Sequence, residues 1–267
     1  MTYGRTAAWA VSVLAALASA PAGAASDTPL LDPAKVIAIS QGAIGRTIGD
    51  HQLVDSTGAP LQLSNYRGKP LVISLVYSSC STVCPPTTQH VIDVVNEAGR
   101  MFGLDGFAVL TVGFDTRNDT PARMAQFASA QGIKLPNWRV ASGDPANIDG
   151  LLKDIGFTYR AVAGGFDHPT QTTIVDREGK VYRQVYGEDF PSQMFMEPMK
   201  DVVYGTHTAF TVDGIFNRIR FICTAYDPVG RRYRFDYSFV TGVVLAAASL
   251  LAMGGWIVRE WRRSARA

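Results

Sequence analysis

The chain has 267 residues and a formal net charge of +2 at pH 7. Because the charge is nearly balanced and no basic stripe interleaves with aromatic residues in the central part, nucleic acid is excluded as a partner. Three cysteines are too few for a disulfide-rich scaffold, so a close pair of them indicates redox, structural or metal-binding chemistry in an exported chain.

An export signal is predicted at the N-terminus. Arg5 precedes an apolar run over residues 7–20, and Ala22-Gly23-Ala24 fits the small-residue pattern at which signal peptides are cleaved. The run is too short for a comfortable membrane span, which argues against an uncleaved anchor. We therefore expect residues 1–24 to be a removed signal peptide and residues 25–204 to form the folded domain.

The first strands of the domain are predicted from the pattern of apolar residues. Segments 52–55 and 60–63 alternate between apolar and polar residues around Ser56-Thr57-Gly58, which indicates a hairpin. The continuous apolar run over residues 70–77 predicts a buried strand. This strand leads directly to the most informative motif of the chain.

That motif is the cysteine pair Cys80 and Cys84, which lies between the buried strand and a helix that begins with Pro85 and Pro86. Residues i and i+4 share a helix face, with Cβ atoms roughly 5–6 Å apart. Two sulfurs placed in this way can close a disulfide or bind one soft metal ion, and the electropositive helix N-terminus favours their thiolate forms. Redox pairs are usually spaced C-x-x-C, so the extra residue here favours metal binding over thiol–disulfide exchange.

The rest of the domain alternates between strands and helices. Thr120 is expected to cap a helix that has Pro121 at its first position. The other predicted elements are strands at 107–113, 138–141, 172–175 and 180–186, and helices that follow Cys84 and that cover 146–155 and 192–203. This order predicts an α/β fold with a partly parallel sheet, and a cysteine pair between a strand and a long helix indicates a thioredoxin-like arrangement.

Two further segments follow the domain. Residues 205–238 are basic and aromatic, and strands at 220–226 and 231–237 are predicted around the type I turn Asp227-Pro228-Val229-Gly230. This juxtamembrane hairpin is expected to pack on the domain or lie on lipid headgroups, with contact to a partner as the alternative.

A C-terminal single-pass transmembrane helix is predicted over residues 239–258. This stretch carries no charge, and 20 residues at about 1.5 Å each span roughly 30 Å, the thickness of a bilayer's hydrocarbon core. A buried core helix is the alternative. Residues 259–267 hold four arginines and are expected to form a cytoplasmic tail, which would place the domain on the exported side.

His168 is the candidate for a third metal ligand. It stands just before a predicted strand, in a loop that lies beside the cysteine turn in a thioredoxin-like fold. His90 faces another side of its helix, His51 lies near the first hairpin and His207 lies beyond the last helix of the domain. A solvated or structural histidine is the alternative for His168.

The chain resembles the Sco/SenC family of copper-binding assembly factors for cytochrome c oxidase. Its segment Cys80-Ser81-Thr82-Val83-Cys84-Pro85 is similar to the family's C-x-x-x-C-P motif, and residues 112–121 resemble the family's strand-end segment that ends in Asp-Thr-Pro. The third similarity is His168, followed eight residues later by Asp176. The matches run from about Leu53 to about Tyr186, roughly half of the chain.

The resemblance implies a thioredoxin-like fold and one copper ion bound by Cys80, Cys84 and His168. It further implies a metallochaperone rather than an enzyme, which delivers copper to the dinuclear copper centre of an oxidase subunit or reduces the thiols of that centre. The expected partners are the copper-bearing subunit of cytochrome c oxidase, a periplasmic thiol reductant and another copper chaperone. The expected location is the bacterial inner membrane, with the domain on the periplasmic side.

The sequence leaves alternative functions open. The main alternative is a periplasmic thiol–disulfide oxidoreductase, with Cys80 and Cys84 as its redox-active pair and no stable copper binding. An interaction module with incidental cysteines is a third class. A peroxidase fits less well, because no arginine lies near Cys80 in the sequence.

Several residues carry smaller expectations. Asp115 is a candidate for holding the cysteine loop by hydrogen bonds, with an ordinary strand-end carboxylate as the alternative. Pro169 and the C-terminal position of the anchor depart from the family's pattern. Cys223 is expected to be a packed strand residue or a contact with a partner. The methionines at 194, 196 and 199 are expected to pack in the core rather than bind copper.

Overall fold

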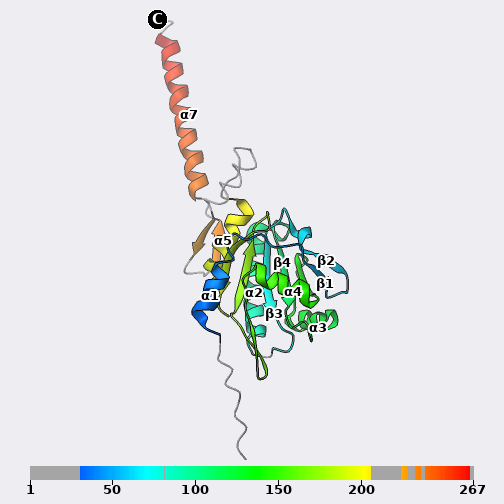
Figure 1. Ribbon diagram of the computed structural model, residues 1–267. Helices are drawn as coiled ribbons and strands as arrows, with labels where there is room; N and C mark the ends of the chain where they lie inside the picture. Colours follow the sequence, from blue (N-terminus) through cyan, green and yellow to red (C-terminus); the bar gives the residue numbers. More distant parts are fainter. Residues whose placement is uncertain (1–30, 81, 206–223, 228–231, 236–237, 265–267) are drawn as a thin grey trace, which may run out of the picture. The chain divides into compact units, whose positions relative to one another are not determined.

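The computed structural model describes residues 31–80, 82–205, 224–227, 232–235 and 238–264. The predicted signal peptide, residues 1–24, therefore lies outside the described residues. So do His207, Cys223 and residues 228–230 of the turn in the predicted juxtamembrane hairpin. Figure 1 shows the helices and strands of the chain.

The domain is built on a mixed seven-stranded sheet with the strand order β2-β1-β5-β4-β3-β8-β9. Its three central strands β3, β4 and β5 are parallel, whereas β8 pairs antiparallel with β3 and β1 pairs antiparallel with β5. The strands are β1 (Gln52–Asp55), β2 (Pro60–Gln62), β3 (Leu71–Val76), β4 (Ala108–Gly113), β5 (Trp138–Ser142), β8 (Gln171–Val175) and β9 (Val181–Tyr186).

Helices flank this sheet, as the α/β prediction requires (Figure 1). The α-helices of the domain are α1 (Pro33–Gln41), α2 (Cys84–Phe102), α3 (Pro121–Gln131), α4 (Pro145–Asp154) and α5 (Ser192–Tyr204), and the 3-10 helices are η1 (Leu63–Tyr66) and η2 (Leu104–Gly106). α2 and α5 pack against each other, and α3 packs against β5. α5 also packs against β8 and β9, so the long helix that carries Cys84 is connected to the sheet through α5.

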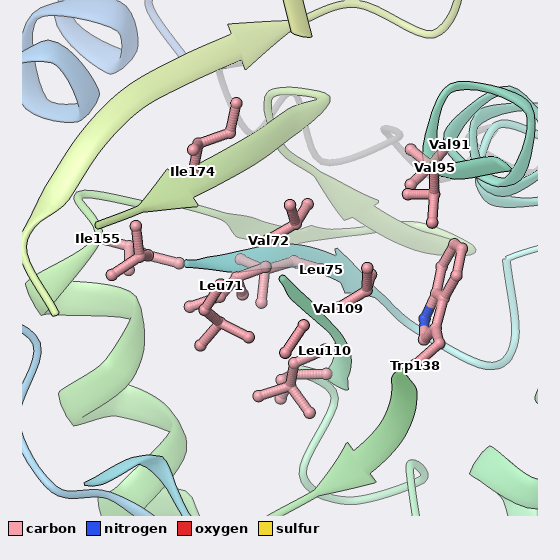
Figure 2. Packing of buried hydrophobic residues seen from close by; sticks show 14 of the residues in the cluster. Leu71, Val72, Leu75, Val91, Val95, Val109, Leu110, Trp138, Ile155 and Ile174 are labelled. Carbon is pink, nitrogen blue, oxygen red and sulfur yellow. The ribbon is translucent and has the colours of Figure 1, made fainter. Parts of the chain in front are cut away.

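The core lies on both faces of the central strands, because every residue of β3 and β4 is buried. Val72 pairs with Val109 across these parallel strands, so both side chains point to the same face. Figure 2 shows Val91 and Val95 of α2 on that side of the sheet, while Leu71 and Leu110 point to the opposite face. Continuous apolar strands are typical of a sheet covered on both sides. The buried-strand predictions for residues 70–77 and 107–113 are confirmed.

The helix-start predictions also hold. Thr120 caps α3, where its side chain accepts a hydrogen bond from the Arg123 amide at 3.3 Å, and Pro121 occupies the first turn. α2 begins at Cys84, with Pro85 and Pro86 in its first turn, where backbone amides have no intrahelical acceptor. The cysteine pair is thus located at the junction of β3 and α2, as the sequence predicts.

Besides the short 3-10 helices η1 and η2, a helix and a hairpin of the domain were not predicted. Helix α1 begins after Asp32, whose carboxylate accepts a hydrogen bond from the Ala34 amide at 3.0 Å. The second is a two-stranded hairpin of β6 (Arg160–Val162) and β7 (Gly165–Asp167). Gly164 takes a positive φ of 85° in its turn, which a residue with a side chain rarely adopts. This hairpin leads directly into His168.

The C-terminal region contains an antiparallel pair, β10 (Thr224–Asp227) and β11 (Arg232–Phe235), and helix α7 (Ser238–Ser264). Residues 224–226 and 232–235 of the two predicted strands are therefore strand residues, and the remaining residues of these predictions lie outside the described residues. In the part of the chain that the structure describes, no helix is both long enough and apolar enough to cross a membrane. The single-pass transmembrane helix expected over residues 239–258 is thus not confirmed.

Candidate metal and thiol site

Cys80 and Cys84 lie next to each other in a tight turn between β3 and α2. The Cys80 amide donates a hydrogen bond to the Tyr77 carbonyl oxygen at 3.0 Å, and the Cys84 amide donates one to the Cys80 sulfur at 3.2 Å. Both cysteines are free thiols. The first turn of α2 therefore presents a backbone donor to the Cys80 sulfur, an arrangement that stabilises negative charge on it.

The two thiols differ in acidity. Burial raises the pKa of Cys80, but the side chain and backbone of Cys84 and the side chain of Tyr77 lower it to about 7. Cys84 is only 4% exposed. This burial is the main cause that raises the pKa of Cys84 well above its usual value, and the hydrogen bond to Cys80 is the second. Cys80 is the accessible thiolate near neutral pH, and Cys84 is its buried, protonated neighbour.

Asp119 anchors the cysteine turn to the end of β4. One carboxylate oxygen accepts a hydrogen bond from the Ser78 amide at 2.8 Å, and the other accepts one from the Asp115 amide at 2.9 Å. Burial raises the pKa of the Asp119 carboxyl, against the lowering effect of these hydrogen bonds. Asp115, the candidate for holding the loop, instead accepts a hydrogen bond from the Asn118 side chain at 2.7 Å, so the alternative of an ordinary strand-end carboxylate holds. The chain turns after β4 and directs Asp119, not Asp115, towards Ser78.

Tyr77 connects the cysteine turn to His168. Its side chain lowers the pKa of the Cys80 thiol, and its own pKa is raised to about 12, chiefly by burial. Its ring meets the His168 ring edge-on, with centroids 5.8 Å apart, and also contacts Phe114 and Phe166 at 5.5 and 5.1 Å. His168 therefore lies near the end of β3 that leads into the cysteine turn, in contact with the ring of Tyr77.

His168 has one ring nitrogen already engaged. Its Nδ1 lies 3.0 Å from the carbonyl oxygen of Pro169. A carbonyl oxygen only accepts hydrogen bonds, so Nδ1 carries the proton and Nε2 keeps the lone pair that a metal ligand needs. The peptide bond to Pro169 is trans, since no described bond is cis. His168 also lines a groove of about 350 Å³ that runs beside the start of α1.

The three predicted ligands are not brought into one cluster. Among the described residues, no three His, Cys, Asp or Glu side chains lie close enough to hold a single metal ion. Cys80 and Cys84 are adjacent, whereas His168 packs into the aromatic cluster of Phe114, Phe157 and Tyr77. Binding of one metal ion by Cys80, Cys84 and His168 therefore stays a prediction.

The two other described histidines, His51 and His90, and the methionines of α5 lie outside this site. His51 bonds Asp154 at 2.7 Å, and His90 bonds the Phe190 carbonyl at 2.8 Å. Met196 and Met199 are fully buried, which confirms core packing for these two, whereas Met194 is 48% exposed. The residues that sequence analysis missed are Tyr77 and Asp119, although both stand in segments that it singled out.

The sequence matches a protein-family model and a curated relative of the same family. A family model described as SCO1/SenC matches residues 41–203. A SCO1 protein homolog from Bacillus subtilis (strain 168) is 24% identical over 159 residues, which cover 58% of this chain and 78% of that protein.

Solved structures agree with this match. A putative electron transfer protein from Aquifex aeolicus VF5 is 29% identical with a TM-score of 0.57, over 63% of this chain and 99% of that one. Bradyrhizobium japonicum ScoI, solved with copper bound, is 24% identical with a TM-score of 0.50, over 58% of this chain and 99% of that one. The mixed sheet with flanking helices therefore matches the thioredoxin-like structures of this group.

Proposed function

Since this chain belongs to the SCO1/SenC family, we propose that it is a copper chaperone that takes part in the assembly of cytochrome c oxidase. Cys80, Cys84 and His168 are its proposed ligands. The observation that carries this proposal is the reduced cysteine pair at the start of α2, in which Cys80 has a pKa of about 7 and accepts a hydrogen bond from the Cys84 amide.

The donor set suits copper. Two thiolates and one imidazole are soft or borderline ligands, which bind Cu(I) well and which Mg²⁺ and Ca²⁺ do not prefer. The lone pair on Nε2 of His168 is free for a metal because Nδ1 bonds the Pro169 carbonyl. Since His168 now packs against Tyr77, binding by all three residues requires a shift of the loop around His168 or of the Tyr77 ring.

The difference in exposure and acidity between Cys80 and Cys84 suggests how the protein binds and releases copper. Cys80 is the more exposed of the two and is a thiolate near neutral pH, so it is the first sulfur that an incoming copper ion meets. Cys84 must lose its proton when copper binds, which couples binding to proton release. Copper then passes to the acceptor by ligand exchange with the cysteines and histidines of the acceptor.

The proposal is tested by copper binding to the reduced protein in three variants. We expect Cys80→Ala to abolish tight binding, and His168→Ala to weaken it at least tenfold while the fold stays intact. His90→Ala is the matched control, because His90 lies on α2 and contacts Phe190, away from the thiols. If His168→Ala and His90→Ala bind copper equally well, His168 is not a ligand.

A second candidate function is thiol–disulfide exchange with the thiols of the acceptor. One observation favours it: the accessible thiolate of Cys80 lies beside the buried thiol of Cys84. In this reaction the Cys80 thiolate attacks an acceptor disulfide, and the Cys84 sulfur then closes the Cys80–Cys84 disulfide as the acceptor leaves reduced. Rapid exchange with glutathione disulfide, in a protein that retains no copper, would favour this function.

The proposed location is the exported side of the bacterial inner membrane. The compartment on that side is oxidising and converts the cysteine pair to a disulfide. Three partners follow from the proposed chemistry: a periplasmic thiol reductant, the copper-bearing subunit of the oxidase and a second copper chaperone as the donor. The location is tested by fusing alkaline phosphatase after residue 204, which is active only if exported. An inactive fusion would refute this placement.

A further inference from the structure

The groove that His168 lines is bounded by three parts of the domain: the start of α1, the residues between β7 and β8, and the residues that follow β9. Its volume of about 350 Å³ suits a short segment of a partner rather than a whole secondary-structure element. Since His168 is a proposed copper ligand, a segment bound in this groove would contact one of the ligands.

The walls of the groove are connected by hydrogen bonds between residues far apart in the chain. The Leu31 amide donates to the Asp167 carboxylate at 2.7 Å, which links the chain before α1 to the residue before His168. Near the end of α1, the Ser40 hydroxyl accepts a hydrogen bond from the Tyr186 hydroxyl at 2.7 Å, and Tyr186 also lines the groove. The groove is therefore formed before any partner binds, and a preformed surface loses little conformational freedom on binding.

The exposed side of α1 is apolar, which is unusual for a helix at the surface of a domain. Only Val36 and Ser40 of its nine residues are buried, whereas Ile37 and Ile39 are 39% and 45% exposed. A helix that packs one side against a domain usually presents polar residues on the other side. Val36 and Ile37 line the groove together with Pro33. Exposed apolar residues gathered beside a groove are typical of a surface that contacts another molecule.

The charge of the groove limits which molecule can bind there. Among the described residues that line it, Asp167 and Glu188 are acidic and none is Lys or Arg. The Asp167 carboxylate already accepts the hydrogen bond from Leu31, whereas Glu188 is exposed to solvent. These carboxylates repel an anionic lipid headgroup and attract a lysine or arginine of a partner. The groove therefore fits an apolar side chain that has a basic residue next to it.

We propose that this groove is the docking surface for the copper acceptor, and that it binds a segment of the acceptor in which an apolar residue stands next to a lysine or arginine. The apolar side chain packs against Val36 and Ile37, and the basic residue faces Glu188. This proposal rests on the proposed function, because the acceptor is the protein that receives copper from the cysteine pair or is reduced by it. It adds the contacts that hold the acceptor beside the site.

The test is the affinity of the reduced full chain for the soluble copper-bearing domain of the oxidase subunit, prepared without metal and measured by isothermal titration calorimetry. Ile37→Asp places a charge in the apolar part of the groove. We expect it to weaken binding about tenfold or more, since an unpaired charge in an interface is costly. Ile44→Asp is the matched control, because Ile44 is 38% exposed and does not line the groove. We expect it to change the affinity about twofold or less.

A second pair of variants tests the charge of the groove. We expect Glu188→Lys to weaken binding about threefold or more at low ionic strength, and less in high salt, because salt screens charges at the surface. Glu178→Lys makes the same change in the turn between β8 and β9, outside the groove, and should have no such effect. All four substituted residues are exposed, so the variants should fold like the wild type, which urea denaturation checks.

Three results would overturn the proposal. The first is an acceptor domain that does not bind the wild-type chain. The second is an acceptor domain that binds Ile37→Asp as tightly as it binds Ile44→Asp. The third is self-association of the wild-type chain that Ile37→Asp abolishes and Ile44→Asp does not, as measured by sedimentation, because a second copy of the chain would then cover the groove.

The outcomes also separate this proposal from the copper function. If the wild-type protein retains no copper but Ile37→Asp still weakens binding of the acceptor domain, the copper proposal fails and the docking surface stands. If copper binding depends on the cysteines while all four variants bind the acceptor domain equally well, the docking surface fails and the copper proposal stands.

Discussion

Replacing Asp119 with alanine should destabilise the domain and loosen the cysteine turn. The Asp119 carboxylate accepts hydrogen bonds from the amides of Ser78 and Asp115, and it is the side chain that ties the turn to the end of β4. Asp119 is 3% exposed, so water does not readily replace it as the acceptor. Alanine would leave both amides without a partner.

The magnitude follows from these two amides. A buried donor that loses its acceptor costs about 1–3 kcal/mol, so two of them cost about 2–6 kcal/mol. Burial of the carboxylate opposes this, as the raised pKa of Asp119 indicates, and alanine removes that unfavourable contribution. We therefore expect the free energy of unfolding to fall by about 2–4 kcal/mol. Asp119→Asn keeps one acceptor oxygen and should lose about half as much.

Urea denaturation measures this loss. The fluorescence of Trp138 reports on unfolding, because its indole is buried and donates a hydrogen bond to Thr111 at 3.0 Å. Trp256 and Trp261 are 66% and 73% exposed, so their emission should change little. Asp115→Ala is the control: it removes the contact with Asn118 and leaves both acceptors on Asp119. Equal stability of Asp119→Ala and the wild type would refute the assignment of Asp119 as the anchor of the turn.

Three further predictions concern single residues. The rate of Cys80 alkylation by iodoacetamide should rise with pH and reach half its maximum near pH 7, because the thiolate that reacts predominates above its pKa of about 7. Cys84 should stay unreactive over the same range, and equal rates for both thiols would contradict the assigned difference in acidity. Trp138→Phe should lower the free energy of unfolding by about 1 kcal/mol through loss of the hydrogen bond to Thr111, so an unchanged urea midpoint would count against that bond. Gly113→Ala should lower it by about 1–3 kcal/mol, since its Cβ would lie 2.6 Å from that of Asp119; full stability would mean that this contact relaxes freely.

Local patterns in the sequence predict most of the sheet and the position of the thiols. The apolar runs over β3 and β4 are continuous because both faces of these strands are covered, and such runs are visible without a structure. The start of α2 at Cys84 follows from two prolines that fit only a first helical turn. These features depend on residues close to one another in the chain.

The elements that were missed depend on distant contacts. β6 and β7 have three residues each, too few for a periodic pattern, and β7 packs Phe166 against Tyr77, the residue that follows β3. α1 is short, seven of its nine residues are more than one-third exposed and only Val36 and Ser40 are buried, so its only clear local signal is the cap Asp32. Tertiary packing, rather than local preference, stabilises such short elements.

The candidate site likewise combines features that the local sequence predicts with features that depend on contacts between distant residues. Asp115 and Asp119 lie four residues apart in one predicted loop, and only the path of the chain after β4 decides which carboxylate reaches Ser78. The sequence places His168 near the thiols through the order of elements, but the distance between its ring and Cys80 depends on how the aromatic cluster packs. A full ligand set is a geometric property that spacing along the chain does not determine.

The most direct test of the proposed function is the copper content of the reduced full-length protein after dialysis, with and without the Cys80→Ala and Cys84→Ala substitutions together. The account predicts one tightly bound copper ion per chain in the wild type and none in the double variant. A wild-type protein that retains no copper, or a double variant that retains as much as the wild type, would contradict it.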